Sequence, residues 1–224
     1  MVIRLKPRVA TSACLVGEPV RYDGGHRHSQ TLTSDLAERC ELLPYCPEIE
    51  MGMSVPRETI RIEAQANGSF SLLGNTTQTD FTPALEELVQ TKMQAFAEAD
   101  VSGFVVKARS PSCAAGTYPL APASDGLFTA AIRKHFPNLA LVDETEIAVP
   151  EKLRQFQIRV FVAHFRAEAL LDTLPDAPRA RLEQALPDFA TARQSVLELL
   201  HSLPLAVEHR PLLDSLLNRL DPRP

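Results

Sequence analysis

Three of the four cysteines, Cys14, Cys46 and Cys113, each follow a short apolar run of the kind that forms a buried strand. In an open α/β sheet, ligands bind beyond the carboxyl ends of the strands, so cysteines that follow separate strands can converge although none belongs to a C-x-x-C pair. Free thiols in a reducing compartment are more often metal ligands or reactive groups than disulfide partners. The spacing therefore predicts one shared site for these three cysteines.

The elements expected to position these cysteines alternate between strand and helix. Strands are expected at 9–15, 42–46, 103–108 and 139–142, and helices from Thr33 or Ser34 and at 82–99 and 124–136. Residues 58–64 and 69–73 flank Asn67-Gly68, a dipeptide typical of tight hairpin turns. The pattern predicts an α/β fold with a mostly parallel, Rossmann-like sheet and a β-hairpin insertion.

After Pro150 only helical patterns follow, at 151–173, at 179–203 with an interruption at Pro187, and at 211–220. We therefore expect an α/β domain over 1–149, which carries the three-cysteine site, and an all-helical C-terminal segment over 150–224. Acidic and basic residues balance in this segment, so the net charge of −5 belongs to residues 1–149.

The composition, with 45% hydrophobic and 23% charged residues, is that of a soluble globular protein. The net charge of −5 argues against a protein that coats nucleic acid with its whole surface. No stretch approaches the ~20 apolar residues of a membrane span, and the N-terminus has no apolar signal core, so we expect a cytoplasmic protein without a membrane partner. Residues 1–28 carry five basic side chains and only two acidic ones, and the basic residues are Arg4, Lys6, Arg8, Arg21 and Arg27. This local positive charge could bind a small anionic or phosphorylated ligand. The alternative is a basic terminus that is simply exposed to solvent.

Three segments around the cysteines resemble the thiouracil desulfidase family, once known only as a domain of unknown function. They read S-A-C-L-V-G-E-P-V-R-Y-D-G-G from Ser12, C-P-E-I-E-M-G-M-S-V-P-R-E from Cys46 and K-A-R-S-P-S-C from Lys107. The G-M-S-V-P-R-E form and the helical stretch 153–164 are most similar to the two-domain branch that removes sulfur from 4-thiouridine of RNA, with a shortened helical tail here.

The resemblance implies a 4Fe-4S cluster held by only three cysteines, Cys14, Cys46 and Cys113, which leaves one iron open to the sulfur of a substrate. The implied enzyme is an iron–sulfur desulfidase that hydrolytically removes sulfur from thiolated pyrimidines (2- or 4-thiouracil or 4-thiouridine, free or in RNA) and releases sulfide. The expected partner is a small thiolated pyrimidine or nucleoside, with tRNA as a further candidate. The expected state is a monomer or a small homo-oligomer.

The resemblance assigns catalytic work to Glu48, the glutamate of C-P-E, which lies two residues after a cysteine. Ser110 is the preferred proton-transfer partner and Ser112 the second choice. The alternative readings are a solvated loop carboxylate for Glu48 and a helix cap or turn residue for either serine.

For substrate binding, Tyr22 and Asp23 could read a pyrimidine edge, Gly24 would let the backbone approach the ligand, and Arg109 would meet a phosphate or form an ion pair. The alternative is a Gly-rich turn capped by Asp23. A buried ion pair between Arg57 and its neighbour Glu58 is expected to fix the hairpin.

Two departures from the family pattern are Ala114, where the family usually has glycine, and Cys40, which matches no family ligand and lies within a predicted helix. We expect Cys40 to be a partly buried thiol, the alternative being a fourth ligand that closes the open iron. Two other functions stay open: a non-catalytic zinc or closed iron–sulfur module completed by Cys40, His26 or His28, and an RNA-binding adaptor that uses the helical tail.

Overall fold

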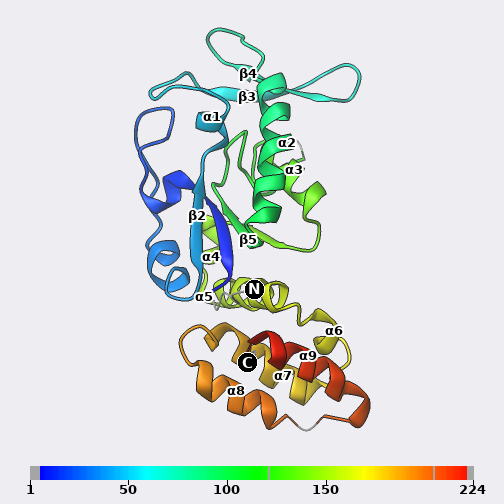
Figure 1. The fold of residues 1–224 in the computed structure, drawn as a ribbon. Helices are drawn as coiled ribbons and strands as arrows, with labels where there is room; N and C mark the ends of the chain where they lie inside the picture. The colour runs from blue at the N-terminus through cyan, green and yellow to red at the C-terminus, as the bar shows by residue number, and fades with distance from the viewer. Residues whose placement is uncertain (1–5, 121, 204, 221–224) are drawn as a thin grey trace.

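The computed structural model describes residues 6–120, 122–203 and 205–220, which form a sheet, a separate hairpin and a set of helices (Figure 1). The sheet has four strands and the hairpin two. The sheet strands are β1 Arg8–Ser12, β2 Glu41–Tyr45, β5 Val101–Val106 and β6 Ala140–Asp143, and the hairpin strands are β3 Ile60–Ala64 and β4 Phe70–Gly74.

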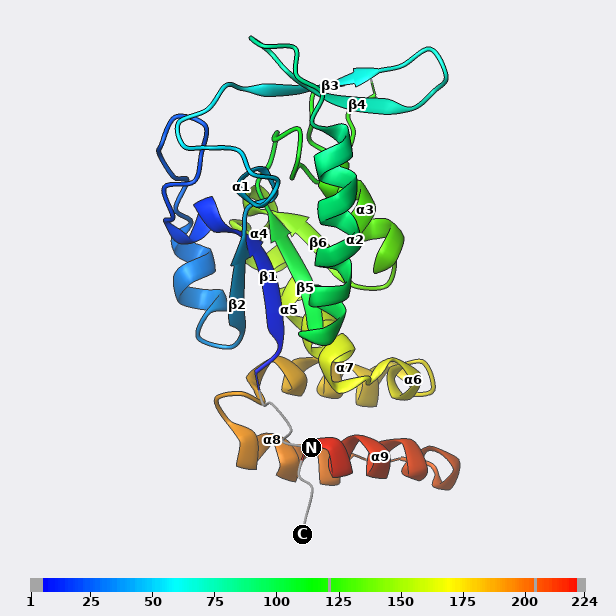
Figure 2. The same cartoon turned by 45° about the horizontal axis from the view of Figure 1, so that its top comes forward.

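The four-stranded sheet is parallel throughout and has the order β2-β1-β5-β6. The chain first moves from β1 to β2 on one side and later to β5 on the other, so β1 marks the point where the strand order reverses. The hairpin lies beyond the carboxyl ends of these strands (Figure 2). The predicted α/β fold with a parallel sheet, a hairpin insertion and C-terminal helices is confirmed.

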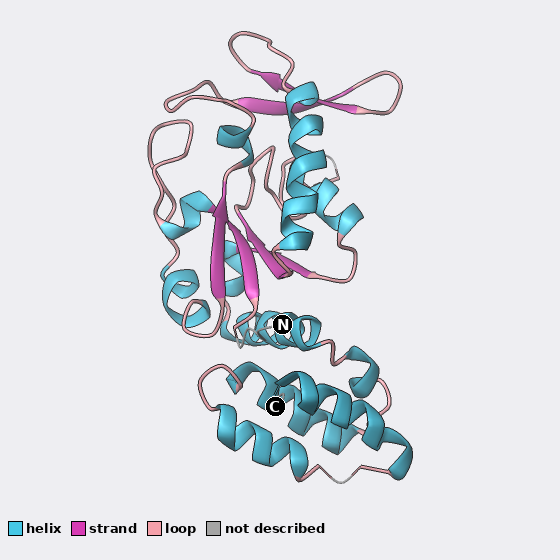
Figure 3. Cartoon of the chain, in the orientation of Figure 1, coloured by secondary structure: helices cyan, strands magenta, loops and turns pink. Residues whose placement is uncertain are grey.

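Helices cover both faces of the sheet because successive strand residues point to opposite sides. Ala10 and Phe104 pack with α2 (Thr82–Glu98) and α3 (Leu127–His135) in one hydrophobic cluster. Val9 and Val105 pack on the other side with α4 (Glu144–Ile147) and α5 (Pro150–Phe165) in a second cluster (Figure 3). The two layers hold the strand ends, and hence the loops that follow them, in fixed positions.

The tail is helical and is interrupted at Pro187, both as expected, but a further break falls at a residue that the pattern did not single out. The predicted helix at 151–173 is divided, because Arg166 ends α5 in the left-handed conformation with φ 53°. Pro187 lies in a 3₁₀ turn, Leu186–Asp188, that separates two further helices. No helix within the described ranges is both long and apolar enough to cross a membrane. The remaining helices are α6 Glu168–Leu171, α7 Asp176–Ala185, α8 Arg193–His201 and α9 Arg210–Leu220.

Two expectations near the first cysteine are wrong in detail. The strand expected at 9–15 ends at Ser12, and Ala13–Val16 form a 3₁₀ turn closed by Gly17, whose φ of 98° suits glycine. The helix expected from Thr33 or Ser34 is a single π-helical turn, Leu32–Leu36, after Thr31. It stays short because β2 already begins at Glu41, whose N–H is bonded to the carbonyl of Pro7 at 2.9 Å.

Candidate active site

A cavity of about 460 Å³ lies at the carboxyl ends of β1, β2 and β5, and all three predicted cysteines line it. Cys14 comes from the turn after β1, Cys46 from the residue after β2, and Cys113 from the loop after β5. This is where the strand order reverses, the place where ligands bind in open α/β sheets. The structure thus brings together three thiols that are far apart in the sequence.

Burial favours the neutral form of each thiol. It raises the pKa of Cys14 to about 11 and that of Cys113 well above the usual value, and charge on Cys46 raises both further. A hydrogen bond from Ser12 acts in the opposite direction on Cys113. Cys46 precedes the one-turn helix α1 (Pro47–Glu50); burial raises its pKa, although the N–H groups of this turn act to lower it. The mutual effects of the thiols show that they share one electrostatic environment.

No group of three or more His, Cys, Asp or Glu side chains in the described part of the chain is arranged to hold a single metal ion. The thiols instead surround a cavity. A four-iron cluster is larger than one ion, so its ligands stand farther apart than those of a tetrahedral zinc site. The donor set, three soft sulfurs around an open volume, fits a cluster with three protein ligands.

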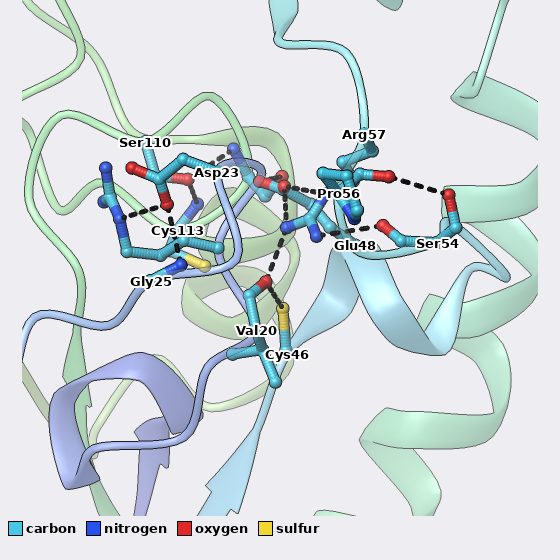
Figure 4. Close-up of polar contacts among 12 residues, drawn as sticks. Val20, Asp23, Gly25, Cys46, Glu48, Ser54, Pro56, Arg57, Ser110 and Cys113 are labelled. Carbon is cyan, nitrogen blue, oxygen red and sulfur yellow. Dashed lines mark hydrogen bonds and ion pairs between the residues drawn. The ribbon is translucent and has the colours of Figure 1, made fainter.

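Glu48 lines the cavity, and both of its carboxylate oxygens accept hydrogen bonds from side chains; Figure 4 shows Arg57 beside it. Arg57 Nε donates to Oε2 at 2.9 Å, and Ser112 Oγ donates to Oε1 at 3.0 Å. The Arg57 and Glu48 side chains are only 5% and 15% exposed, so this ion pair is shielded from solvent. Because each carboxylate oxygen has two lone pairs, Oε1 can accept a further hydrogen bond from the cavity side.

Arg57 also joins the loops that follow the first two strands. Its Nη2 donates to the carbonyl oxygen of Val20 at 2.8 Å, and its backbone N–H donates to that of Tyr22 at 2.9 Å. The expected pair between Arg57 and Glu58 is wrong, because the Arg57 guanidinium turns into the cavity wall toward Glu48. Glu58 instead accepts hydrogen bonds from the turn after β4, including 2.7 Å from the N–H of Thr76.

The two candidate serines occupy different positions. Ser110 lines the cavity, and its Oγ accepts the N–H groups of Ser112 and Cys113, both at 3.2 Å. No residue in the described part of the chain accepts the Ser110 proton, so it is available to a group in the cavity. Ser112 is buried and does not line the cavity; its hydroxyl is directed to Glu48. Ser110 thus has, in part, the turn-stabilising role given above as an alternative, and Ser112 orients the Glu48 carboxylate.

The loop that carries Cys113 is fixed by close packing. Thr129 Oγ1 donates to the Cys113 carbonyl at 2.6 Å. A methyl group on Gly126 would lie 2.5 Å from the backbone carbon of Ser112, so only glycine permits this approach. Ala114 is buried and is not among the described residues with positive φ, so the loop accepts alanine where the family usually has glycine.

The predicted substrate-binding residues divide into two pairs. Tyr22 and Arg109 line the cavity, and both are exposed at its mouth. Asp23 and Gly24 lie outside the lining; Asp23 Oδ1 accepts the N–H of Gly25 at 3.0 Å, as in the capped-turn alternative (Figure 4). Cys40 is buried in the hydrophobic cluster between the sheet and α5, away from the cavity, and burial raises its pKa to about 12.

The charge of the cavity wall is mainly positive. Glu48 is the one acidic residue among the described lining residues, and it pairs with Arg57. Lys107 pairs with Glu144 at 2.5 Å. The cationic lining residues are Arg21, Arg27, Arg57, Lys107 and Arg109. Neither Arg27 nor Arg109 has an acidic partner in the described part of the chain. Of the other basic N-terminal residues, Arg8 pairs with Glu41, and Arg4 lies outside the described residues.

One lining residue that sequence reasoning missed is Tyr45, directly before Cys46. Its hydroxyl is buried and has no hydrogen-bond partner in the described structure. Burial, and then the charges of Cys113, Glu50, Cys46 and Cys14, raise its pKa well above the usual value. A tyrosine at the end of an apolar strand segment is predicted to belong to the hydrophobic core. Only the adjacent cysteine could have indicated that Tyr45 lies at the site.

Comparisons with known proteins agree with this geometry. The model of the 2-thiouracil desulfurase family matches residues 9–144, which include all three cysteines. A solved structure, a 4Fe-4S-dependent thiouracil desulfidase named TudS, is 26% identical, with similarity over 68% of this chain and 99% of that one and a TM-score of 0.53. No curated protein matches the chain. Since the family model spans more than half of the residues, the chain belongs to the 2-thiouracil desulfurase family.

Proposed function

We propose that this protein is an iron–sulfur-dependent desulfidase that hydrolyses the thiocarbonyl group of thiolated pyrimidines and releases sulfide. One observation carries the proposal: three thiols from separate strand ends line the same cavity as the Glu48 carboxylate. A 4Fe-4S cluster bound by Cys14, Cys46 and Cys113 would supply, at its remaining iron, a Lewis acid for the substrate sulfur. The likeness to TudS, itself 4Fe-4S-dependent, supports this cofactor.

The protein residues would then move the protons. Glu48, which lines the cavity, would accept a proton from water as the water oxygen bonds to the ring carbon. The Ser110 hydroxyl would donate a hydrogen bond to the pyrimidine ring and keep its proton. Glu48 would give its proton to the sulfur and then take the second proton of the water as the carbon–sulfur bond breaks. The sulfur then leaves as hydrosulfide, the carbonyl oxygen derives from water, and Glu48 releases the remaining proton to solvent. The reaction needs no oxidant or reductant, and free thiols favour a reducing compartment such as the cytoplasm.

The positive wall favours a substrate that carries negative charge. Arg27 and Arg109 at the cavity lining lack acidic partners in the described part of the chain, so a phosphate would gain charge-assisted hydrogen bonds there. A thiouridine nucleotide, or the phosphate backbone beside a thiouridine in tRNA, offers this group, whereas a free thiouracil base does not. We therefore place phosphorylated thiouridine before the free base as the preferred substrate.

Anaerobic reconstitution with iron and sulfide tests the proposal. We expect a brown protein whose colour is bleached by dithionite, and which converts 4-thiouridine, its 5′-monophosphate or a thiouracil with loss of the thiocarbonyl absorption and release of sulfide. A colourless protein that takes up zinc instead would indicate the non-catalytic metal module. A brown protein that is inactive on these three substrates and on thiolated tRNA would exclude desulfidase activity.

A further inference from the structure

Tyr45 ends β2 with a hydroxyl group whose burial the protein chain does not explain. The residue is 3% exposed, and its oxygen has no hydrogen-bond partner in the described structure. The ring packs against Phe96 and Phe128, with centroids 5.2 and 5.6 Å away. Buried polar groups in native proteins are nearly always paired. A phenylalanine would keep the ring contacts, so the hydroxyl indicates a partner other than the described residues of the chain.

The position of Tyr45 narrows the choice of partner. It lines the same cavity as the three cysteines and shares a hydrophobic cluster with Cys113. Its ring packs among aromatic side chains, so the hydroxyl has the cavity that the three cysteines line as its open side. A second tyrosine in the lining, Tyr118, differs because its hydroxyl accepts the N–H of Ile62 at 3.1 Å. Of the two lining tyrosines, only Tyr45 has a hydroxyl without a hydrogen-bond partner in the described structure; the other buried hydroxyl without one, Thr11 Oγ1, does not line the cavity.

We propose that Tyr45 is a positioning residue for the cofactor, and that its hydroxyl donates a hydrogen bond to a sulfur atom of the iron–sulfur group held by Cys14, Cys46 and Cys113. The inference rests on the proposed function. Hydrogen bonds to cluster sulfurs withdraw electron density and raise the reduction potential. The same withdrawal makes the open iron a stronger Lewis acid, which gives Tyr45 a share in the chemistry without contact with the substrate.

The test compares Tyr45→Phe with Tyr118→Phe after anaerobic reconstitution. The two variants make the same chemical change in one cavity, but of these two hydroxyls only that of Tyr45 lacks a partner in the described structure. We expect a more negative midpoint potential in Tyr45→Phe and a potential close to wild type in Tyr118→Phe. In the reduced, paramagnetic state, electron–nuclear double resonance in H₂O and D₂O should show an exchangeable proton coupled to the wild-type cluster that Tyr45→Phe lacks.

The cofactor-free proteins provide a second readout. Without the cluster, Tyr45→Phe should unfold at the same temperature as wild type or higher, because the change removes an unpaired buried group. On loading, it should gain less stability than wild type. A lower melting temperature of cofactor-free Tyr45→Phe would show that the hydroxyl has a partner in the fold itself and would overturn the inference.

The outcomes also separate this inference from the proposed function. Wild-type protein that binds no cluster would overturn both. Wild-type protein that binds the cluster, together with a Tyr45→Phe variant of unchanged potential and unchanged proton coupling, would overturn the role of Tyr45 and leave the desulfidase proposal intact.

Discussion

Glu48 is held by residues on two other segments, Arg57 at one oxygen and Ser112 at the other, and this arrangement fixes a carboxylate toward the cavity. We expect Glu48→Gln to keep the cluster colour and to lower kcat by about 10²- to 10⁴-fold, the usual cost of removing a general base. Glutamine preserves the size of the side chain beside the buried Arg57, so folding should survive. Sulfide release and the visible spectrum, measured on the same sample, provide the check.

Glu50→Gln is the matched control. Glu50 lies on the same short helix but pairs with Lys92 at the surface, at 2.7 Å. It should retain wild-type turnover and colour. Equal activity in Glu48→Gln and Glu50→Gln would remove Glu48 from the mechanism.

Arg109 offers a test of substrate charge, because it is exposed at the cavity mouth and has no acidic partner in the described chain. We expect Arg109→Ala to raise KM for 4-thiouridine 5′-monophosphate by about tenfold, since a hydrogen bond to a charged group contributes ~1.5–3 kcal/mol. KM for the uncharged nucleoside should stay the same. An equal rise for both substrates would mean that Arg109 shapes the cavity and does not bind phosphate.

The chemistry-bearing residues could be predicted where a motif keeps them adjacent, as with Cys46 and Glu48. Hydrogen bonds and ion pairs between residues far apart in the sequence could not be predicted. Arg57 was assigned to its neighbour Glu58, but the guanidinium reaches Glu48 and Val20, a choice that depends on loop packing. The unpaired hydroxyl of Tyr45 was equally hidden, since its isolation is visible only when every nearby donor and acceptor is placed.

At the scale of elements, the loop after β5 leaves little room beside Gly126. Gly126 lies against it so closely that an added methyl group would meet three backbone atoms at 2.5–2.7 Å. Backbone atoms cannot move aside as a side-chain tip can, so Gly126→Ala should displace Cys113 from the other two thiols. We expect this variant to bind less iron than wild type and to unfold at a lower temperature, as measured by iron content and thermal melting.

Gly68→Ala is a control for the general effect of replacing a glycine. An added methyl group there would meet no atom within 4 Å, although its φ of 83° adds some strain to the hairpin turn. It should bind iron as wild type does. Full iron binding by Gly126→Ala would show that the loop can adjust and that the position of Cys113 does not depend on this contact.

The long elements were predictable because they repeat a clear pattern. The expected helix at 82–99 is α2 within one residue, and the hairpin forms around Asn67-Gly68. The short elements could not be predicted in this way, because tertiary contacts determine their length and type. The turn at Leu32–Leu36 is limited by the start of β2, and Cys14 lies in a 3₁₀ turn that the apolar run up to Leu15 conceals.

In the whole molecule, the helical tail and the sheet share one hydrophobic core. A single cluster runs from Val9 in β1 through Phe156 and Val160 of α5 to Leu182 in α7 and Leu216 in α9. Gly103 allows this contact, since a methyl group there would lie 2.6 Å from Val160 Cγ2. We propose that the boundary at residues 149 and 150 separates two compositions and does not separate two independently stable units.

Shared packing predicts that a cavity made in the tail will weaken the α/β part. Leu182 is fully buried in α7, so Leu182→Ala should lower the free energy of unfolding by about 2–5 kcal/mol. The three tyrosines, Tyr22, Tyr45 and Tyr118, all lie in the α/β part, so their near-ultraviolet signal reports its unfolding separately from far-ultraviolet helicity. Both signals should shift together in Leu182→Ala. Neither should move in Gln184→Ala, an exposed change on the same helix. If helicity melts early while the tyrosine signal keeps its wild-type midpoint, the tail unfolds alone and the shared core does not couple the two parts.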